Sequence, residues 1–445
     1  MRCVIVGGDA AGMSAASQIR RQRPEWSITV LEKGRFTSYA ACGIPYAVAG
    51  DVESIRDLEV FPAERFRQER RIDVRTSTEA TAIDLGARTL RLAHEGGEET
   101  IGWDRLLLAT GALPIVPPWP GRELQGVVVV RNLEDLARLT SLLEQGPRRA
   151  VVVGGGYVGL EMAEALARRG LEVAVVERAD GVMGGLDPHI TELVQEEMAG
   201  RCDLRLSTTV TGFEGHGGVL RAVTTDAGPL EADLAVVALG VRPNVELARA
   251  AGISLGETGA VAVDAHQRTS APDVFAAGDC AEALHRVTGR PAWVPLALTA
   301  NRQGRVAGVC MADGDATFPG IVGSAVTRVC ELAIARTGLD SAAAARAGIQ
   351  TQSVEASGTD RAHYIRGHQA VWIKLVFRAD DRRLVGALLA GRDAALGKRC
   401  DVLATAITAG MTVDDVADLD LCYAPPFAPV WDPILRAANK AAFAG

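Results

Sequence analysis

Cys42 is the residue whose type and sequence setting most directly indicate chemistry. It lies in the run SYAACGIPY over residues 38–46, shortly after a strand that ends in an acidic residue. No two cysteines are spaced as CxxC or CxxxxC, so a metal knuckle and an internal dithiol both lack their local signature. If Cys42 is redox-active, the second sulfur or oxygen must therefore come from a bound small molecule. The sequence contains eight cysteines, which are Cys3, Cys42, Cys202, Cys280, Cys310, Cys330, Cys400 and Cys422.

The other cysteines and the histidines give weaker signals. Cys280 follows Gly278 and Asp279 in an apolar setting and is predicted to be a small buried filler. Cys422 lies beside Tyr423, but we expect no redox role for it because buried cysteines are usually inert. The seven histidines show no ligand spacing, so the sequence predicts no metal site.

Composition and charge limit the classes of protein to which the chain can belong. Its 445 residues suggest about three domains. The net charge of −8 provides no global basic field for nucleic acid or an anionic membrane. No stretch approaches the roughly 20 apolar residues that a membrane span needs. The start, MRCVIVGGDAAG, is interpreted as a first strand rather than a signal peptide, and unpaired cysteines without an export signal predict a cytoplasmic protein.

Two segments have the pattern of a dinucleotide-binding βαβ unit. In the first, an apolar strand at 3–7 leads into the glycine turn of residues 7–12, a helix and a second strand at 28–31. Glu32 ends that strand, where an acid can accept a hydrogen bond from a ribose hydroxyl. The unit departs from the fingerprint at its middle glycine position, which holds Asp9.

The second unit keeps all three glycines of the fingerprint. A strand at 150–153 leads into the turn GGGYVG at 154–159, and after a helix a strand at 173–176 ends at Glu177. The glycines let a pyrophosphate approach the helix N-terminus, where backbone N–H groups and the helix dipole favour anions. Glu177 predicts a preference for NADH, because a carboxylate accepts from the 2′-hydroxyl and repels a 2′-phosphate. Arg178 follows at once, so NADPH is not excluded.

Further strands flank the second unit. Apolar strands at 106–108 and 236–239 are each followed by a turn of small residues. A third apolar strand is followed by Asp279, which could reach a ribityl hydroxyl. From about residue 325 the pattern changes, and strands at 371–377 and 384–389 are predicted to pair antiparallel before a run of helices. This change indicates a separate C-terminal α+β domain.

Together these motifs resemble the FAD-dependent pyridine nucleotide–disulfide oxidoreductases. The SYAACGIPY run resembles the catalytic-cysteine motif of their single-cysteine branch, which comprises CoA-disulfide reductase, NADH oxidase, NADH peroxidase and persulfide reductase. The resemblance implies an α/β fold with two Rossmann-like dinucleotide-binding domains, as in glutathione reductase, and a C-terminal α+β dimerisation domain. The implied boundaries are 1–115 and 245–322 for the FAD domain, 116–244 for the NAD domain and 325–445 for the dimerisation domain.

The resemblance also implies FAD and NADH as cofactors and a set of residues that bind them. These residues are Gly7, Gly8, Ala11, Gly12, Glu32, Lys33, Thr110, Gly111, Gly154, Gly156, Tyr157, Val158, Gly159, Glu177, Gly240, Asp279 and Ala297.

The substrate expectation rests on a few further positions. Peroxidase and oxidase members of the branch carry a histidine at position 10, whereas Ala10 in this chain favours a thiol–disulfide substrate. A second departure is Ala41, where CoA-specific members usually have asparagine, so one hydrogen bond to coenzyme A is expected to be missing. The residues that match coenzyme A contacts are Gln18, Arg21, Ser38, Asn301 and Arg305. The alternative is that Arg20, Arg21 and Arg23 only complement the C-terminus of the first helix.

Two tyrosines match residues that a partner subunit contributes to the active site. The segment LCYAPPF at 421–427 resembles the inserted segment, so Tyr423 is predicted to face Cys42 of the other subunit in a homodimer with shared active sites. Tyr364 resembles a second such tyrosine. Ordinary packing of aromatic residues in an interface is the alternative for both.

The implied activity passes electrons from NADH through FAD and Cys42 to a low-molecular-weight disulfide, with CoA disulfide as the first choice. Residues 42–45 look like a helix start, and the helix dipole is expected to lower the pKa of Cys42. Tyr364 and Tyr423 are expected to hold or protonate the leaving thiolate. NADH oxidase and persulfide or polysulfide reductase are alternative enzymes. A flavin-bound redox sensor without turnover is a further alternative, which the complete NAD unit disfavours.

Overall fold

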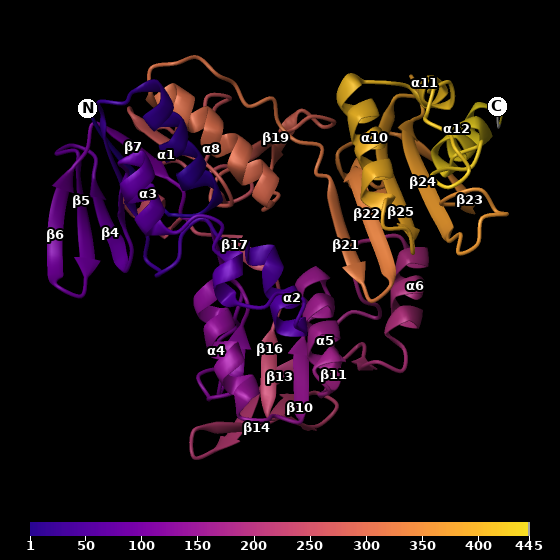
Figure 1. The fold of residues 1–445 in the computed structure, drawn as a ribbon, viewed down its shortest axis with the longest axis horizontal. Coiled ribbons are helices and arrows are strands. Elements are labelled where there is room, and N and C mark those ends of the chain that lie inside the picture. Colours follow the sequence, from indigo (N-terminus) through magenta and orange to yellow (C-terminus); the bar gives the residue numbers. More distant parts are fainter. Residues whose placement is uncertain (444–445) are drawn as a thin grey trace.

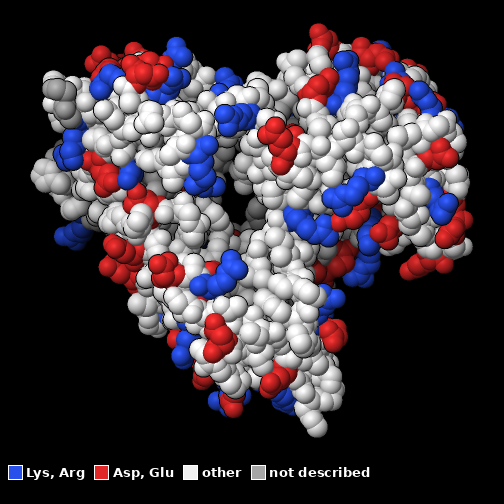
Figure 2. Space-filling model, turned by 180° about the vertical axis from the view of Figure 1, so that it is seen from behind, with Lys and Arg blue, Asp and Glu red and all other residues white. Residues whose placement is uncertain are grey.

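Residues 1–443, the part of the chain that this computed structural model describes, form three lobes (Figure 1). The N-terminus lies in the first lobe, the second lobe lies below it in Figure 1, and the C-terminal residues form the third. Seen from behind, the molecule is hollowed between the first and third lobes, and acidic and basic side chains are interspersed over that face (Figure 2). No helix among residues 1–443 has the length and apolar character needed to cross a membrane.

The first lobe has a parallel sheet with helices packed on it. Its central elements are β1 (Arg2–Val6), α1 (Ala10–Gln22), β2 (Ser27–Leu31), α3 (Ala63–Arg70), β3 (Asp73–Arg75), β7 (Arg105–Leu108), β18 (Val274–Ala276) and α8 (Ala297–Met311). The strand order is β18-β7-β1-β2-β3, and all pairs are parallel. Residues 3–6 of β1 are all buried, as expected for a strand covered on both faces.

Helices α1 and α8 lie side by side although their sequences are far apart (Figure 1). Glycines of α8 allow this approach, because a Cβ on Gly304 would collide with the carbonyl oxygen of Ala11 in α1. Gly308 meets the backbone of Ala15 one turn further along in the same way. The contact brings polar side chains of both helices to one surface.

Smaller elements complete the first lobe and link it to the second. They are the antiparallel sheet of β4 (Thr78–Asp84), β5 (Thr89–His94) and β6 (Gly97–Gly102), the hairpin of β19 (Ala283–His285) and β20 (Arg290–Ala292), and α7 (Glu246–Ala250). The chain passes between the lobes along an antiparallel ribbon of β8 (Ala112–Pro114) and β17 (Val241–Pro243).

The second lobe repeats the parallel-sheet design. Its elements are β9 (Val127–Val129), α4 (Leu133–Glu144), β10 (Arg149–Val153), α5 (Tyr157–Arg168), β11 (Glu172–Val176), α6 (Pro188–Met198), β12 (Asp203–Arg205) and β16 (Leu234–Val237), with an antiparallel sheet of β13 (Val210–His216), β14 (Val219–Thr225) and β15 (Leu230–Glu231). The strand order of the parallel sheet is β12-β11-β10-β16-β9.

A segment that precedes the second lobe in the sequence packs into its core. It consists of the 3₁₀ turns η1 (Ala41–Gly43) and η2 (Ile55–Leu58) around α2 (Ile44–Ala49). Ile44, Val48 and Leu58 are buried in the same hydrophobic core as Leu160 and Leu166 of α5. Figure 1 shows α2 beside α5. Cys42, in η1, is therefore held between the first two lobes.

The third lobe is an antiparallel sheet with helices on one face. Its elements are β21 (Ala325–Val329), β22 (Leu332–Gly338), α9 (Ser341–Arg346), β23 (Thr351–Thr359), β24 (Ala370–Arg378), β25 (Leu384–Gly391), α10 (Leu396–Ala409), α11 (Val413–Ala417) and α12 (Pro433–Ala442). The order is β21-β22-β25-β24-β23. Leu389 faces the core beneath α10, and its neighbours Leu388 and Ala390 face the core of the second lobe. Period-two alternation thus fixes this lobe against the second.

The predicted fold class is confirmed: two parallel-sheet α/β lobes are followed by an α+β lobe whose strands β24 and β25 pair antiparallel. Local bounds differ slightly. The helix of the second unit begins at Tyr157, and the strand predicted at 236–239 ends at Val237. The exact domain boundaries stay predictions.

Candidate active site

The two glycine turns share one geometry. Gly7 and Gly154 have positive φ angles of 113° and 109°, and a Cβ on either would collide with a carbonyl oxygen of the neighbouring strand end. A Cβ on Gly12 would collide with the Gly7 carbonyl oxygen, and one on Gly159 with that of Gly154. These four glycines therefore allow close backbone packing that a side chain would prevent.

The strand-end acids hold their turns closed. Oε2 of Glu32 accepts a hydrogen bond from Gly8 N at 2.7 Å, and Oε2 of Glu177 accepts one from Gly155 N at 2.8 Å. Burial raises the pKa of the Glu32 carboxyl above its ordinary value. Each acid thus positions the loop as well as standing where a ribose hydroxyl would be recognised.

The helices that follow the two glycine turns, and α8 of the first lobe, have no side-chain cap at their N-termini. The N-cap residues are Asp9 for α1, Gly156 for α5 and Leu296 for α8, and none of them makes a side-chain capping hydrogen bond to its own helix. Uncapped first-turn N–H groups are a favourable site for a phosphate or another anion. The three helix ends therefore fit the dinucleotide groups that the sequence predicts, with Ala297 as the first residue of α8.

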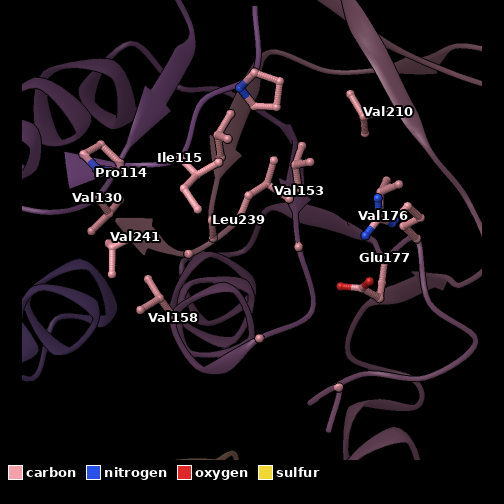
Figure 3. A pocket seen from close by; sticks show the side chains of 18 of the residues that line it. Pro114, Ile115, Val130, Val153, Val158, Val176, Glu177, Val210, Leu239 and Val241 are labelled. Carbon is pink, nitrogen blue, oxygen red and sulfur yellow. The ribbon is translucent and has the colours of Figure 1, made fainter. Parts of the chain in front are cut away.

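A cavity of about 670 Å³ opens at the second glycine turn (Figure 3). Figure 3 shows apolar side chains along its walls and Glu177 at one end. The Tyr157 hydroxyl is buried, and no atom of residues 1–443 satisfies it. Arg178 also lines this cavity. The predicted cofactor residues that line it are Gly154, Gly156, Tyr157, Val158, Glu177 and Gly240.

Cys42 is exposed, but its pKa is not lowered as the sequence predicts. The surrounding protein desolvates the thiol and raises its pKa, and Glu161 adds to this rise. The expected lowering by a helix dipole is wrong, because Cys42 lies in a 3₁₀ turn ahead of a helix of only six residues. The nearby Arg131 guanidinium is the group that lowers the pKa of Cys42.

Arg131 and Glu161 are site residues that the sequence analysis missed. Arg131 Nη2 lies 2.7 Å from Oδ2 of Asp279, and Arg131 also lines the large cavity, so it bridges the first two lobes. Glu161 Oε1 accepts a hydrogen bond from Thr327 of the third lobe at 2.7 Å. Glu161 could have been found, because it lies one helical turn after Tyr157 on the same face of α5. No local signal marks Arg131.

A second cavity, of about 450 Å³, lies where α1 and α8 meet. Its walls include all five predicted substrate residues, Gln18, Arg21, Ser38, Asn301 and Arg305, together with Arg70 and Arg302, which the sequence analysis did not single out.

The first helix divides its arginines between this cavity and structural contacts. Arg20 donates to the backbone carbonyls of Arg70, Pro24 and Trp26, which all lie outside α1, so this arginine makes structural contacts. Arg21 instead faces the cavity. Lys33, a predicted cofactor residue, is exposed and pairs with Glu79 at 2.9 Å.

The two predicted tyrosines meet in the third lobe. Tyr423 is the neighbour of Tyr364 that raises the pKa of the Tyr364 hydroxyl. Both side chains are exposed, as is Cys422, so the expectation that Cys422 is buried is wrong. Cys280 is fully buried, as predicted. Within residues 1–443, no group of His, Cys, Asp and Glu side chains is arranged to hold a metal ion.

Comparisons with known proteins agree with this geometry. Residues 1–304 match the family described as pyridine nucleotide-disulphide oxidoreductase, and residues 324–433 match the dimerisation domain of the same family. The chain is 39% identical to the NAD(P)H coenzyme A polysulfide/persulfide reductase of Pyrococcus horikoshii, over 99% of this chain and 98% of that protein. It is 28% identical to the coenzyme A disulfide reductase of Staphylococcus haemolyticus, over 99% of both.

A solved structure extends the likeness to the fold. The NAD-dependent persulfide reductase of A. fulgidus superimposes with a TM-score of 0.95 at 39% identity, covering 99% of this chain and 83% of that one. The chain belongs to the pyridine nucleotide-disulphide oxidoreductase family. It is an oxidoreductase that uses FAD and a pyridine nucleotide, as the two glycine turns predict.

Proposed function

We propose that the chain transfers electrons from NADH through FAD and Cys42 to a disulfide of coenzyme A. The observation that carries the proposal is the cavity between α1 and α8, where Gln18 and Arg21 meet Asn301 and Arg305. Four arginines are among the residues that line it, and these are Arg21, Arg70, Arg302 and Arg305. Such a cluster suits the phosphates of coenzyme A on a chain whose net charge is −8.

The cavity also leads toward the reacting sulfur. Ser38 lines it and lies only a few residues before Cys42, whose thiol is exposed. A coenzyme A molecule with its phosphates among the arginines could therefore extend its thiol end toward Cys42. Ala41 provides no side-chain hydrogen bond there, so recognition depends on the phosphate end.

FAD fits the first lobe through the chemistry of its groups. The turn at 7–12 and the uncapped ends of α1 and α8 would bind its anionic groups, and Thr110, Gly111 and Asp279 follow β7 and β18 at the same sheet edge. When bound, the flavin supplies a two-electron acceptor for hydride and a donor to sulfur. The large cavity at Glu177 would hold the nicotinamide nucleotide, with NADH preferred and NADPH accepted through Arg178.

The sulfur chemistry balances with one protein thiol. The Cys42 thiolate attacks one sulfur of CoA disulfide, which forms a Cys42–CoA disulfide and releases one CoA thiolate. Two electrons from NADH, delivered through the bound cofactors, then cleave that disulfide into the Cys42 thiolate and a second CoA thiolate. Each turnover consumes one NADH, one proton and one CoA disulfide and yields NAD⁺ and two CoA thiols. Arg131 assists by favouring the thiolate of Cys42.

A second copy of the chain would complete the site. Several large apolar side chains of the third lobe are exposed, and they include Tyr364, Tyr423, Phe427 and Trp431. An exposed apolar surface of this kind suits an interface. We propose a homodimer in which these tyrosines face Cys42 of the other subunit and protonate the leaving thiolate. We also propose the cytoplasm as its compartment, because all eight cysteines are free thiols.

Reduction of a CoA persulfide is the second candidate, favoured by the two relatives at 39% identity that are named persulfide reductases. The same cavity and Cys42 would serve, with hydrosulfide as the group that leaves.

Stopped-flow absorbance separates the candidates and tests the cavity. Enzyme reduced with one equivalent of NADH should be reoxidised rapidly by CoA disulfide and slowly by glutathione disulfide. Arg305→Ala should raise the KM for CoA disulfide about tenfold without slowing reduction by NADH, as expected for losing one charge-assisted contact. Arg346→Ala, at an exposed arginine of α9, is the matched control. Equal rates with both disulfides would rule out the coenzyme A proposal, and faster reoxidation by CoA persulfide would favour the second candidate.

A further inference from the structure

Asp9 departs from the dinucleotide fingerprint, and the structure shows how its side chain is used. Asp is among the best N-cap residues, yet the Asp9 carboxylate makes no capping hydrogen bond to its own helix α1. Its Oδ1 accepts a hydrogen bond from Tyr39 N at 3.1 Å instead. Directly beside it, Ser38 N donates to Gly8 O at 2.9 Å. Two hydrogen bonds therefore tie the glycine turn to the segment that leads to Cys42.

The second unit keeps only the backbone tie, in which Met183 N donates to Gly155 O at 2.8 Å, and has no counterpart of the bond made by the Asp9 side chain. Gly156 occupies the position of Asp9, and a Cβ placed there would meet open space. The turn at 154–159 is thus free of the constraint that Asp9 imposes on the turn at 7–12.

The Asp9 carboxylate lies in a mainly acidic cluster. Besides burial, Glu32 at the end of β2 raises the pKa of Asp9, Arg131 ahead of α4 lowers it, and the charge of Asp9 in turn raises the pKa of Tyr39. Arg131 is already paired with Asp279. Burial is the main cause that raises the pKa of Asp9 to about 6. In its ionised form Asp9 also contributes to the raised pKa of Cys42.

We propose that Asp9 is a positioning residue: its carboxyl group fastens the flavin-binding turn to the Cys42 segment, and its negative charge opposes both FAD binding and thiolate formation at Cys42. The hydrogen bond needs only an acceptor oxygen, so it survives loss of the charge. The charge acts because it stands at the uncapped end of α1, where the pyrophosphate would lie. As the pH falls through the pKa of Asp9, the protein should therefore bind FAD more tightly.

Two variants separate the hydrogen bond from the charge. Asp9→Asn keeps an acceptor for Tyr39 N and removes the charge, whereas Asp9→Gly removes both and restores the fingerprint. Asp84→Asn is the matched control, because Asp84 also accepts a backbone hydrogen bond, from Ala87 N at 2.8 Å in an exposed turn. The measurements are the FAD dissociation constant and the rate of iodoacetamide modification of Cys42, followed by peptide mass spectrometry. Neither needs a disulfide substrate, so their outcome is independent of which disulfide the enzyme reduces.

The charge predicts that only proteins with an ionisable Asp9 change their FAD affinity with pH. In the wild-type protein and in Asp84→Asn, the FAD dissociation constant should rise about tenfold between about pH 5 and about pH 8. In Asp9→Asn it should stay constant, and the pH midpoint of Cys42 modification should fall below that of the wild-type protein. A wild-type pH response in Asp9→Asn would overturn the role of the charge.

The hydrogen bond predicts a difference between the two variants. Asp9→Gly should bind FAD about tenfold more weakly than Asp9→Asn, because the turn is no longer fastened. Cys42 should also be modified faster in Asp9→Gly, because its segment is less constrained. Identical behaviour of the two variants would overturn the positioning role. The effect of Asp9 on the Cys42 thiolate rests on the proposed function, whereas its effect on FAD binding does not depend on that proposal.

Discussion

The turns at 7–12 and 154–159 can be compared atom by atom. Both begin with a glycine at positive φ that packs on a strand end, and both close with a glycine whose Cβ would strike the first carbonyl. In both, an acid accepts the N–H of the second turn residue, at 2.7 Å from Glu32 and 2.8 Å from Glu177. The two turns therefore share the same backbone packing and the same hydrogen bond to a strand-end acid.

The side chain at the third position makes the difference. In the second lobe Gly156 leaves a cavity of about 670 Å³ open to a nucleotide. In the first lobe Asp9 joins its turn to Tyr39 and thus to the Cys42 segment. One copy of the motif suits a nucleotide that must enter and leave in every turnover. The other builds a fixed frame in which the flavin site and the thiol keep their spacing.

The largest expected effect separates the two halves of the reaction. Cys42→Ser should leave flavin reduction by NADH unchanged, because hydride transfer uses the second turn and the flavin. It should lower disulfide turnover by at least about 1000-fold, because an alcohol cannot replace the thiolate nucleophile. Cys422→Ser, at the other exposed cysteine, is the control and should keep wild-type turnover. Stopped-flow reduction followed by steady-state assays measures both, and residual disulfide turnover in Cys42→Ser would reject Cys42 as the nucleophile.

Copying Asp9 into the second turn should break the asymmetry. The φ of Gly156 is −83° and a Cβ there has free space, so Gly156→Asp fits the backbone. The new carboxylate would cap α5 and occupy the anion site, so the KM for NADH should rise about 10- to 100-fold. Gly156→Asn tests the charge alone and should have a smaller effect. An unchanged KM for NADH in Gly156→Asp would show that the pyrophosphate does not bind at this helix end.

The matched acids provide a third test. Glu177→Gln should lower kcat/KM for NADH about tenfold. The ratio of kcat/KM for NADH to kcat/KM for NADPH should also fall, because an amide no longer repels a 2′-phosphate. Glu32→Gln should weaken FAD binding by a similar factor. It should not change the ratio of kcat/KM for NADH to kcat/KM for NADPH. The two measurements are kcat/KM with each nucleotide and the FAD dissociation constant. A change in the nucleotide ratio caused by Glu32→Gln would show that the units are not independent.

The smallest effect concerns stability and pH. The pKa of Asp9 is raised to about 6 in the folded protein, above the ordinary value of an aspartate, so ionisation costs folding stability as the pH rises between these two values. Asp9→Asn should therefore raise the free energy of unfolding by about 2 kcal/mol at pH values above about 7 and by little below about pH 4. Urea unfolding at the two pH values measures this. A gain of equal size at both would assign it to packing instead of charge.

The βαβ units could be predicted because their information is local. Each strand, glycine turn and acid lies within about 30 residues, and steric limits on φ and hydrogen-bond spacing fix their relation. Gly7, Gly12, Gly154 and Gly159 therefore appear where the pattern places them. The antiparallel pair of β24 and β25 could be predicted for the same reason, because the two strands follow each other directly in the sequence.

The pKa of Cys42 could not be predicted in the same way. The run Cys42-Gly43-Ile44-Pro45 looks like a helix start, but its electrostatics come from Glu161 and Arg131, which reach it from α5 and from the residues before α4. Charge and desolvation depend on distances through space, and these are set by the packing of α2 into the second lobe. The sequence shows that Asp9 departs from the dinucleotide fingerprint, but it gives no sign that Tyr39 is the hydrogen-bond partner of Asp9.

The sequence by itself determined two glycine turns of the nucleotide-binding type, a cysteine without a local partner and the order of three lobes, because periodicity and glycine sterics act between near neighbours. Tertiary structure alone decided that Gln18 and Arg21 share a cavity with Asn301 and Arg305, and that Tyr364 meets Tyr423. The first of these meetings depends on Gly304 and Gly308, which let α8 approach α1 at backbone distance. Contacts of this kind join residues far apart in the chain, and only the packing of completed elements can specify them.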